Sequence, residues 1–160
     1  NKGWTVAKRL LQYERTSIGG IGGSSQRAKT MDEMAKEYLG ENEGRIADND
    51  IRDRVLKHRM NDRVYGLTMR RSGEESSSGQ APTFLSSMFK LYGTEQNKDR
   101  FDLMLSIMGS QMLGWEGDAY TGRELGTTRE WLRSKANSIE GGSSEVQLNI
   151  IAKRILGLPD

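Results

Sequence analysis

Apolar residues recur every three or four positions along most of this chain, and only two prolines interrupt it. That spacing puts them on one face of a helix, and the scarcity of proline leaves such helices unbroken. We therefore expect an all-α fold, an up-and-down helical bundle. The expected helices cover residues 3–18, 31–39, 51–71, 84–108, 130–136 and 146–155.

The composition excludes several kinds of site. The 24 basic and 22 acidic residues leave a formal charge of +2, which gives no support for a binder of nucleic acid. With no cysteine and a single histidine, His58, the chain lacks the residues for thiolate catalysis or a His-based zinc site. No apolar run approaches the ~18–20 residues of a membrane span, and no secretion leader opens the chain. We expect a cytoplasmic protein with no metal, membrane or nucleic-acid partner.

Glycine is the unusual component of the chain. Its 19 glycines are many for a helical protein, since each glycine inside a helix costs ~1 kcal/mol relative to alanine. The chain also opens on Asn1 rather than methionine, in sequence typical of the middle of a protein. We therefore expect a fragment of a larger protein.

One turn stands out, where Gly141 and Gly142 precede two serines and the last expected helix. Ser144 and Gln147 have the spacing of a capping box, which predicts a helix N-terminus at about Ser144. Two glycines let a ligand approach the backbone, and the N–H groups of a helix start favour an anionic oxygen such as an enolate or a phosphate. The same residues also describe a tight interhelical turn with nothing bound, and spacing alone favours that interpretation.

A second candidate is Glu14, which follows an apolar pair and lies between Tyr13 and Arg15. A partly desolvated carboxylate has a raised pKa and can act as a general base, although the arginine would oppose that shift. The alternative is a solvated Glu–Arg pair on a helix surface.

Both candidates lie in segments that resemble one family. Residues 138–159 read SIEGGSSEVQLNIIAKRILGLP and resemble the closing signature of the acyl-CoA dehydrogenases. Residues 1–15 read NKGWTVAKRLLQYER and resemble the segment where the middle β-domain of that family passes into its C-terminal helices. The two matches are in order and correctly separated, so the resemblance covers essentially all 160 residues.

The resemblance implies a single C-terminal helical domain over residues 1–160, without the N-terminal helical and middle β-domains of the family. It also implies an FAD-dependent oxidoreductase that oxidises an acyl-CoA to the trans-2-enoyl-CoA. In such enzymes a carboxylate removes the α-proton while hydride passes from the β-carbon to the flavin, and electron-transfer flavoprotein accepts the electrons. Backbone N–H groups at the thioester carbonyl stabilise the enolate-like charge.

Which residue of this chain corresponds to the family's catalytic base depends on its position in the motif. Many members carry it as a Glu directly before Gly-Thr-Ser, but here that position is Gly141, and Glu140 lies one residue early. The isovaleryl- and long-chain-type members carry it in a Glu-Arg pair on the first helix of this domain, which Glu14 and Arg15 match. The resemblance therefore implies Glu14 as the base, Arg15 as its orienting partner, and Gly141 with Gly142 at the substrate carbonyl. Glu140 remains the alternative base.

The resemblance also assigns cofactor contacts. Ser143 stands where members have a flavin-contacting Thr, and Glu145 where they have Gln or Glu at the flavin edge. Family tetramers share FAD contacts between subunits through an Arg-x-x-Phe-Gly motif and a Gln, but residues 39–46 offer only Arg45, and the Gln position falls near Ser106.

These losses lead us to expect a mixed tetramer in which a homologous chain supplies the missing FAD contacts. A homotetramer that uses Arg45 is the alternative. A catalytically silent subunit or oligomerisation module of the family is a hypothesis of another class.

Overall fold

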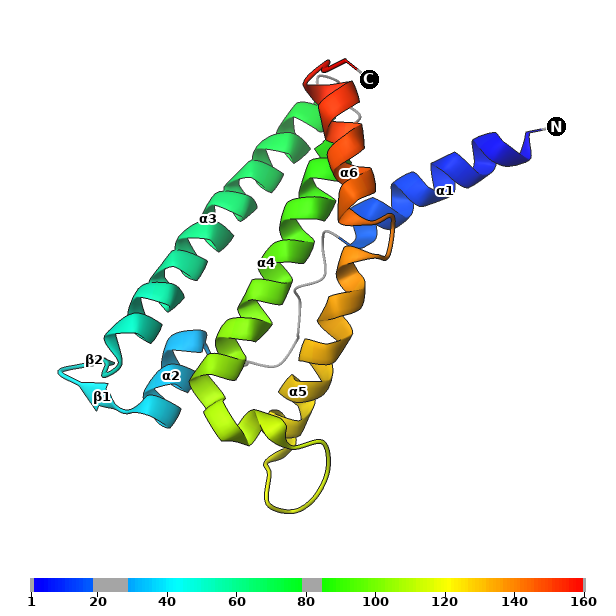
Figure 1. Cartoon of the computed structure of the whole chain (residues 1–160). Coiled ribbons are helices and arrows are strands. Elements are labelled where there is room, and N and C mark those ends of the chain that lie inside the picture. The colour runs from blue at the N-terminus through cyan, green and yellow to red at the C-terminus, as the bar shows by residue number, and fades with distance from the viewer. Residues whose placement is uncertain (1, 19–28, 79–84, 160) are drawn as a thin grey trace. The chain divides into compact units, whose positions relative to one another are not determined.

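A computed structural model describes residues 2–18, 29–78 and 85–159 of the chain, with side chains for residues 2–10, 29–78 and 85–159. These residues form six α-helices. The protein is mostly helical (Figure 1), which confirms the fold class expected from the sequence. The elements in chain order are α1 (Gly3–Ile18), α2 (Met31–Leu39), β1 (Glu41–Asn42), β2 (Arg45–Ile46), α3 (Asn49–Ser77), α4 (Leu85–Met108), the 3₁₀ turn η1 (Gly109–Leu113), α5 (Gly122–Ser134), the 3₁₀ turn η2 (Lys135–Ser138), α6 (Ser144–Ile150) and the π-helical turn η3 (Ile151–Ile155).

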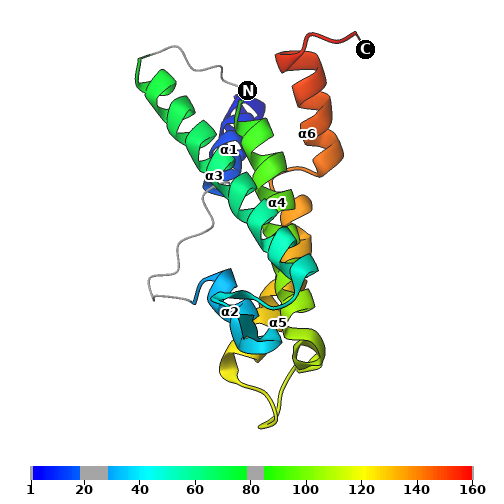
Figure 2. The same cartoon turned by 90° about the vertical axis from the view of Figure 1, so that its left-hand side faces the viewer.

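Helix α5 begins eight residues before the expected helix at 130–136, because the sequence interpretation missed its N-terminal cap. Thr121 and Glu124 form a capping box in which the Glu124 carboxylate accepts the Thr121 backbone N–H at 2.6 Å. Two of the four orphan N–H groups of the helix start are satisfied in this way. Between η1 and α5 the chain forms an open loop (Figures 1 and 2), where the Arg129 guanidinium donates to the Trp115 carbonyl at 2.9 Å.

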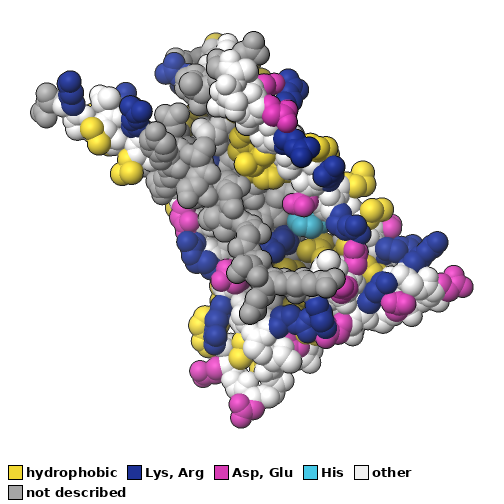
Figure 3. Space-filling model, turned by 180° about the vertical axis from the view of Figure 1, so that it is seen from behind, with side chains coloured by type: hydrophobic (Ala, Val, Ile, Leu, Met, Phe, Trp, Pro, Cys, Tyr) yellow, Lys and Arg dark blue, Asp and Glu magenta, His cyan; other side chains and the backbone are white. Residues whose placement is uncertain are grey.

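Acidic and basic side chains are mixed on the surface, as the face in Figure 3 shows. Several of them pair: Arg123 makes two 3.0 Å hydrogen bonds to the Glu37 carboxylate, and Arg59 bonds Asp32 at 2.6 Å. Among the described helices, none is long and apolar enough to cross a membrane. The described residues also contain no group of three or more His, Cys, Asp or Glu side chains that could hold a metal ion.

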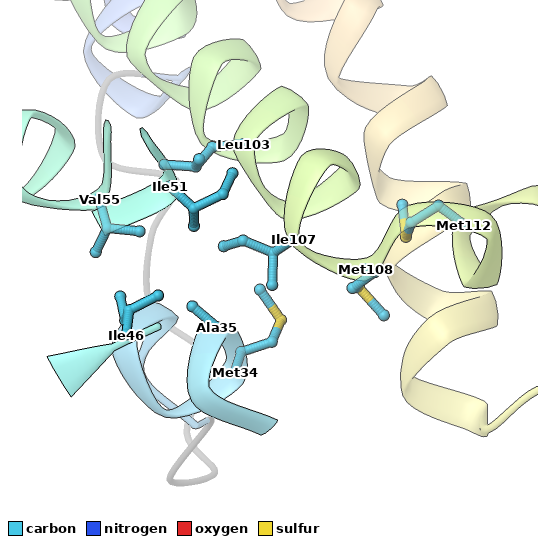
Figure 4. Packing of buried hydrophobic residues seen from close by; sticks show 9 residues of the cluster. All are labelled: Met34, Ala35, Ile46, Ile51, Val55, Leu103, Ile107, Met108 and Met112. Carbon is cyan, nitrogen blue, oxygen red and sulfur yellow. The ribbon is translucent and has the colours of Figure 1, made fainter. Parts of the chain in front are cut away.

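The chain divides into two compact units, and α3 and α4 contribute to both. Unit 2 covers residues 24–63 and 96–135 and contains the apolar core drawn in Figure 4. Its buried cluster consists of Met34, Ala35, Ile46, Ile51, Val55, Leu103, Ile107, Met108 and Met112. These side chains come from α2, β2, α3, α4 and η1, so burial of apolar surface holds the elements of this unit together.

A short hairpin replaces the loop that the polar sequence after Gly40 suggests. Strand β1 pairs antiparallel with β2, with Glu41 opposite Ile46. Glu43 and Gly44 have φ values of 49° and 78°, the left-handed backbone that a two-residue hairpin turn requires. The hairpin places Ile46 in the core of unit 2.

Unit 1 covers residues 1–23, 64–95 and 136–160. Its described buried side chains are polar, unlike the apolar core of unit 2. They are Ser87, Lys90, Thr94, Asn137 and Gln147. The first three are spaced by three and four positions and so form one stripe along α4. On α3, Tyr65 stacks on Tyr92 and donates its hydroxyl hydrogen to the Phe89 carbonyl at 3.0 Å.

Candidate functional site

The Gly141–Gly142 turn lies in unit 1 between η2 and α6. The φ values of the two glycines are +64° and +101°, a backbone region that other residues enter only with strain. At Gly142 a Cβ atom would also stand 2.7 Å from Nε2 of Gln147. Both glycines are therefore required by the shape of the turn.

Gln147 closes the inner side of the turn instead of capping α6. Its side chain is fully buried, and Nε2 donates to the Gly141 carbonyl at 3.0 Å and to the Gly142 carbonyl at 3.4 Å. Helix α6 begins at Ser144 as expected, but the cap is Ser143, whose Oγ accepts the Val146 N–H at 3.4 Å. The capping-box prediction for Ser144 and Gln147 is therefore wrong, because burial turns the glutamine side chain toward the carbonyls.

Helix α4 also holds this segment. The ammonium of Lys90, which has no exposed surface, donates to the Gly142 carbonyl at 2.7 Å. One turn and a half further along, Oε1 of Glu95 accepts the hydroxyl hydrogens of Ser138 and Ser144, each at 3.3 Å. Directional polar contacts thus fix the turn at both of its ends.

Glu145 stands at the opening of α6 with an exposed carboxylate. The Ser143 hydroxyl holds the pKa of this carboxyl below its usual value, with smaller contributions from a backbone N–H and from the positive charge of Lys90. The Glu145 side chain is therefore ionised at neutral pH.

The other site residues expected from the sequence lie in three different parts of the chain. Glu140 is half-buried, and its backbone N–H donates to the Ala136 carbonyl at 3.0 Å. Glu14 and Arg15 lie in α1, whose backbone is described, but their side chains lie outside the described residues. Arg45 belongs to unit 2, where it is exposed on β2 opposite Asn42.

Sequence interpretation missed Lys90, Glu95 and the inward role of Gln147. A usable signal existed for the first of these. Ser87, Lys90 and Thr94 repeat polar side chains at helical spacing on α4, within a helix that otherwise carries many apolar residues. A polar stripe of this kind, where neighbouring faces are apolar, indicates buried groups with specific hydrogen-bond partners.

With this geometry in place, comparison with known proteins gives the family. The family model described as "Acyl-CoA dehydrogenase, C-terminal domain" matches residues 1–156. The chain therefore belongs to the acyl-CoA dehydrogenases, a family of FAD-dependent oxidoreductases, and corresponds to their C-terminal helical domain.

Curated relatives of the chain are distant and longer. It is 27% identical over 157 residues to the acyl-CoA dehydrogenase IpdE1 of Mycolicibacterium smegmatis, a match that covers 98% of this chain and 37% of that protein. It is 26% identical over 159 residues to the acyl-CoA dehydrogenase FadE34 of Mycobacterium tuberculosis, covering 99% of this chain and 20% of that protein. The chain thus spans between a fifth and two fifths of the length of these relatives.

Proposed function

We propose that the protein to which this chain belongs oxidises an acyl-CoA thioester to the trans-2-enoyl-CoA. The observation that carries the proposal is the Gly141–Gly142 turn, whose two carbonyls are held by Gln147 and Lys90. Backbone N–H groups at a turn of this kind can stabilise negative charge on a thioester oxygen. Membership of the acyl-CoA dehydrogenase family supports the reaction class.

In this proposal the α-proton of the substrate passes to the carboxylate of Glu14, which Arg15 orients, while the Gly141 N–H polarises the thioester carbonyl. Two facts support the choice of base. Position 141 is a buried glycine and carries no carboxylate. Helix α1, which carries Glu14, belongs to the same unit as the turn. Glu140 remains the competing base, since it is adjacent to the turn.

The residues at the start of α6 suit the polar edge of a flavin. Ser143 supplies a half-buried hydroxyl and Glu145 an exposed carboxylate. FAD bound there would supply the acceptor for the β-hydride. The cofactor's pyrophosphate would be bound by Arg45 of a neighbouring subunit in a homotetramer, or by a homologous partner chain.

Assembly with further chains is part of the same proposal. Four large apolar side chains of α3 form a stripe that remains exposed: Leu56, Met60, Val64 and Leu67, at 44–62% of their surface. Apolar side chains at this spacing favour burial against another surface. The stripe supports a homo- or hetero-tetramer. It equally favours the second candidate function, a catalytically silent subunit or oligomerisation module.

Expression of the full-length gene alone tests the assembly. A mixed tetramer predicts less than one FAD per chain until a homologous partner is co-expressed. A fully occupied, active homotetramer would contradict it. Electron-transfer flavoprotein is the proposed electron acceptor, to be tested as oxidant of the reduced enzyme.

The base assignment is tested by Glu14→Gln in the full-length protein. We expect normal FAD content but flavin reduction by acyl-CoA slowed by roughly 100- to 10,000-fold, the usual contribution of a general base. Glu140→Gln is the matched control and should reduce its flavin at nearly the wild-type rate. The reverse result would make Glu140 the base. Absence of flavin reduction in the wild type, across acyl-CoAs of differing length and branching, would support the silent-subunit alternative.

A further inference from the structure

Helix α3 carries apolar side chains on a side that remains exposed. It is one continuous helix of 29 residues (Figure 1). Val55 is buried in the core of unit 2, while Met60, about 140° further round the helix, keeps 62% of its surface exposed. Leu56, Val64 and Leu67 complete the exposed stripe. Large apolar side chains in a row of this kind favour burial against another surface.

Opposite charges lie at the two ends of this stripe. Asp53 precedes its first apolar residue and Arg71 follows its last one, and both are exposed. At 100° per residue, Asp53 and Arg71 each lie within about 20° of Met60 round the helix. The Arg71 side chain is 78% exposed even though it pairs with Glu75. The stripe therefore has an acidic end and a basic end.

A surface with this pattern is complementary to a second copy of itself that lies antiparallel. If the pair is centred midway between Met60 and Val64, these two side chains face each other across it. Asp53 and Arg71 both lie nine residues from that centre, so each carboxylate faces the guanidinium of the other copy. A parallel copy would instead bring like charges together at both ends, which is unfavourable. Two-fold interfaces between identical chains are self-complementary in this way.

We propose that α3 is an interface between two copies of this chain, packed antiparallel through the exposed stripe, with an Asp53–Arg71 pair at each end. Burial of the apolar side chains supplies the affinity, and the two ion pairs fix the antiparallel orientation. The inference rests on the assembly part of the proposed function and deepens it, because it names a second copy of the same chain as the occupant of the stripe. A homotetramer contains such pairs, and so does a mixed tetramer with two copies of this chain.

Disulfide crosslinking in the full-length protein tests the orientation, since these 160 residues contain no cysteine. The double variant Leu56→Cys/Leu67→Cys should form a covalent dimer under mild oxidation, with position 56 of one copy linked to position 67 of the other. A disulfide needs Cα atoms within about 7 Å. In the antiparallel pair, equivalent positions of the two copies lie roughly 15–18 Å apart along the helix axis.

The two single variants are the controls for this experiment. Leu56→Cys alone and Leu67→Cys alone should leave the protein without a crosslink at these positions, because each lacks its partner position in the other copy. They also reveal any link to a cysteine elsewhere in the full-length protein. Mass spectrometry of tryptic peptides identifies the linked positions.

Charge reversal tests the ion pairs. Asp53→Arg alone and Arg71→Asp alone each place like charges at both ends, and each should raise the dissociation constant of the pair by about 10- to 100-fold, measured by analytical ultracentrifugation. Co-expression of the two variants restores opposite charges at both ends and should recover the wild-type constant. Because recovery requires the second copy, it excludes a folding defect. Arg70→Asp is the matched control: it makes the same change one residue away, about 100° round the helix, and should pair like the wild type.

A disulfide that joins position 56 to position 56, or no disulfide in the double variant, would overturn the antiparallel pair. Charge reversals that leave the dissociation constant unchanged would also overturn it, and a homologous chain bound to the stripe in place of a second copy predicts that result. Neither measurement involves flavin or turnover. A protein that pairs as described but oxidises no acyl-CoA would therefore overturn the proposed reaction and leave this inference intact.

Discussion

At the scale of single residues, Gly142 shows how much depends on one missing Cβ atom. Its φ of +101° and its 2.7 Å approach to Gln147 both exclude a larger residue. The sequence alone indicated that two glycines here open the backbone to a ligand. It could not indicate that the glycine also admits the side chain of Gln147 from inside, since that contact depends on the path of the chain after the turn.

The variant Gly142→Ala should lower the free energy of unfolding by about 1–3 kcal/mol through backbone strain and the clash with the glutamine amide. Gly126→Ala, on α5, is the matched control: no atom lies within 4 Å of its new Cβ, and it should stabilise the chain by up to about 1 kcal/mol. Urea unfolding followed by circular dichroism measures both. Equal effects of the two substitutions would contradict the assigned strain.

At the scale of elements, apolar periodicity predicted the helices well and their ends poorly. Helix α2 ends at Leu39, before Gly40, as expected, but α3 continues to Ser77, beyond the expected residue 71. Residues 74–82 are rich in serine and glycine, which disfavours a helix, yet Arg71 and Glu75 form a salt bridge of 2.7 Å that supports another turn of helix. Such local pairs are worth a few tenths of a kcal/mol and are hard to weigh from composition.

The contact between α3 and α4 depends on Gly93, because the Tyr65 hydroxyl would lie 2.5 Å from a Cβ at that position. We expect Gly93→Ala to cost about 1–3 kcal/mol by overpacking, although alanine is otherwise the better helix former. Tyr65→Phe alone should cost about 1 kcal/mol through its lost bond to the Phe89 carbonyl.

Combining the two substitutions tests the contact. In the Tyr65→Phe background Gly93→Ala should be much less costly, because the nearest atom is then at 3.1 Å. Thermal unfolding of the four proteins in the cycle gives the coupling. Strictly additive effects would mean that the hydroxyl is not the obstacle.

At the scale of the whole molecule, family membership and the helical architecture were predictable, since the closing signature is long and ordered. The polar interior of unit 1 was not, because sequence patterns mark apolar faces and give no partner for a buried Lys90 or Gln147. The candidate base Glu14 remains a prediction from the resemblance.

The Tyr38–Glu124 hydrogen bond of 2.8 Å should make stability depend on pH at both extremes. The Thr121 N–H and the Tyr38 hydroxyl lower the pKa of the Glu124 carboxyl below 4.5, so its stabilising effect is complete above that pH and is lost as the pH falls through the lowered value. Burial and the Glu124 carboxylate raise the pKa of Tyr38 to about 12, so its contribution is lost between pH 10 and 12.

Urea unfolding across pH 2–12 should show both losses, and Tyr38→Phe should reduce the alkaline one while keeping most of the acidic one. Glu124→Gln should reduce both. If the free energy of unfolding fell equally between pH 10 and 12 in the wild type and in Tyr38→Phe, Tyr38 would not be the cause of the alkaline loss.

The π-helical turn at Ile151–Ile155 has a consequence for the evolution of chain length. The backbone N–H of Leu156 donates to the carbonyl of Ile151, five residues earlier. The turn therefore accommodates one residue more than an α-helical turn. A single-residue deletion in a regular helix rotates everything beyond it by about 100°. A deletion within this turn would instead remove the bulge and leave a continuous α-helix, which makes it the place in this last helix where loss of one codon is most easily tolerated.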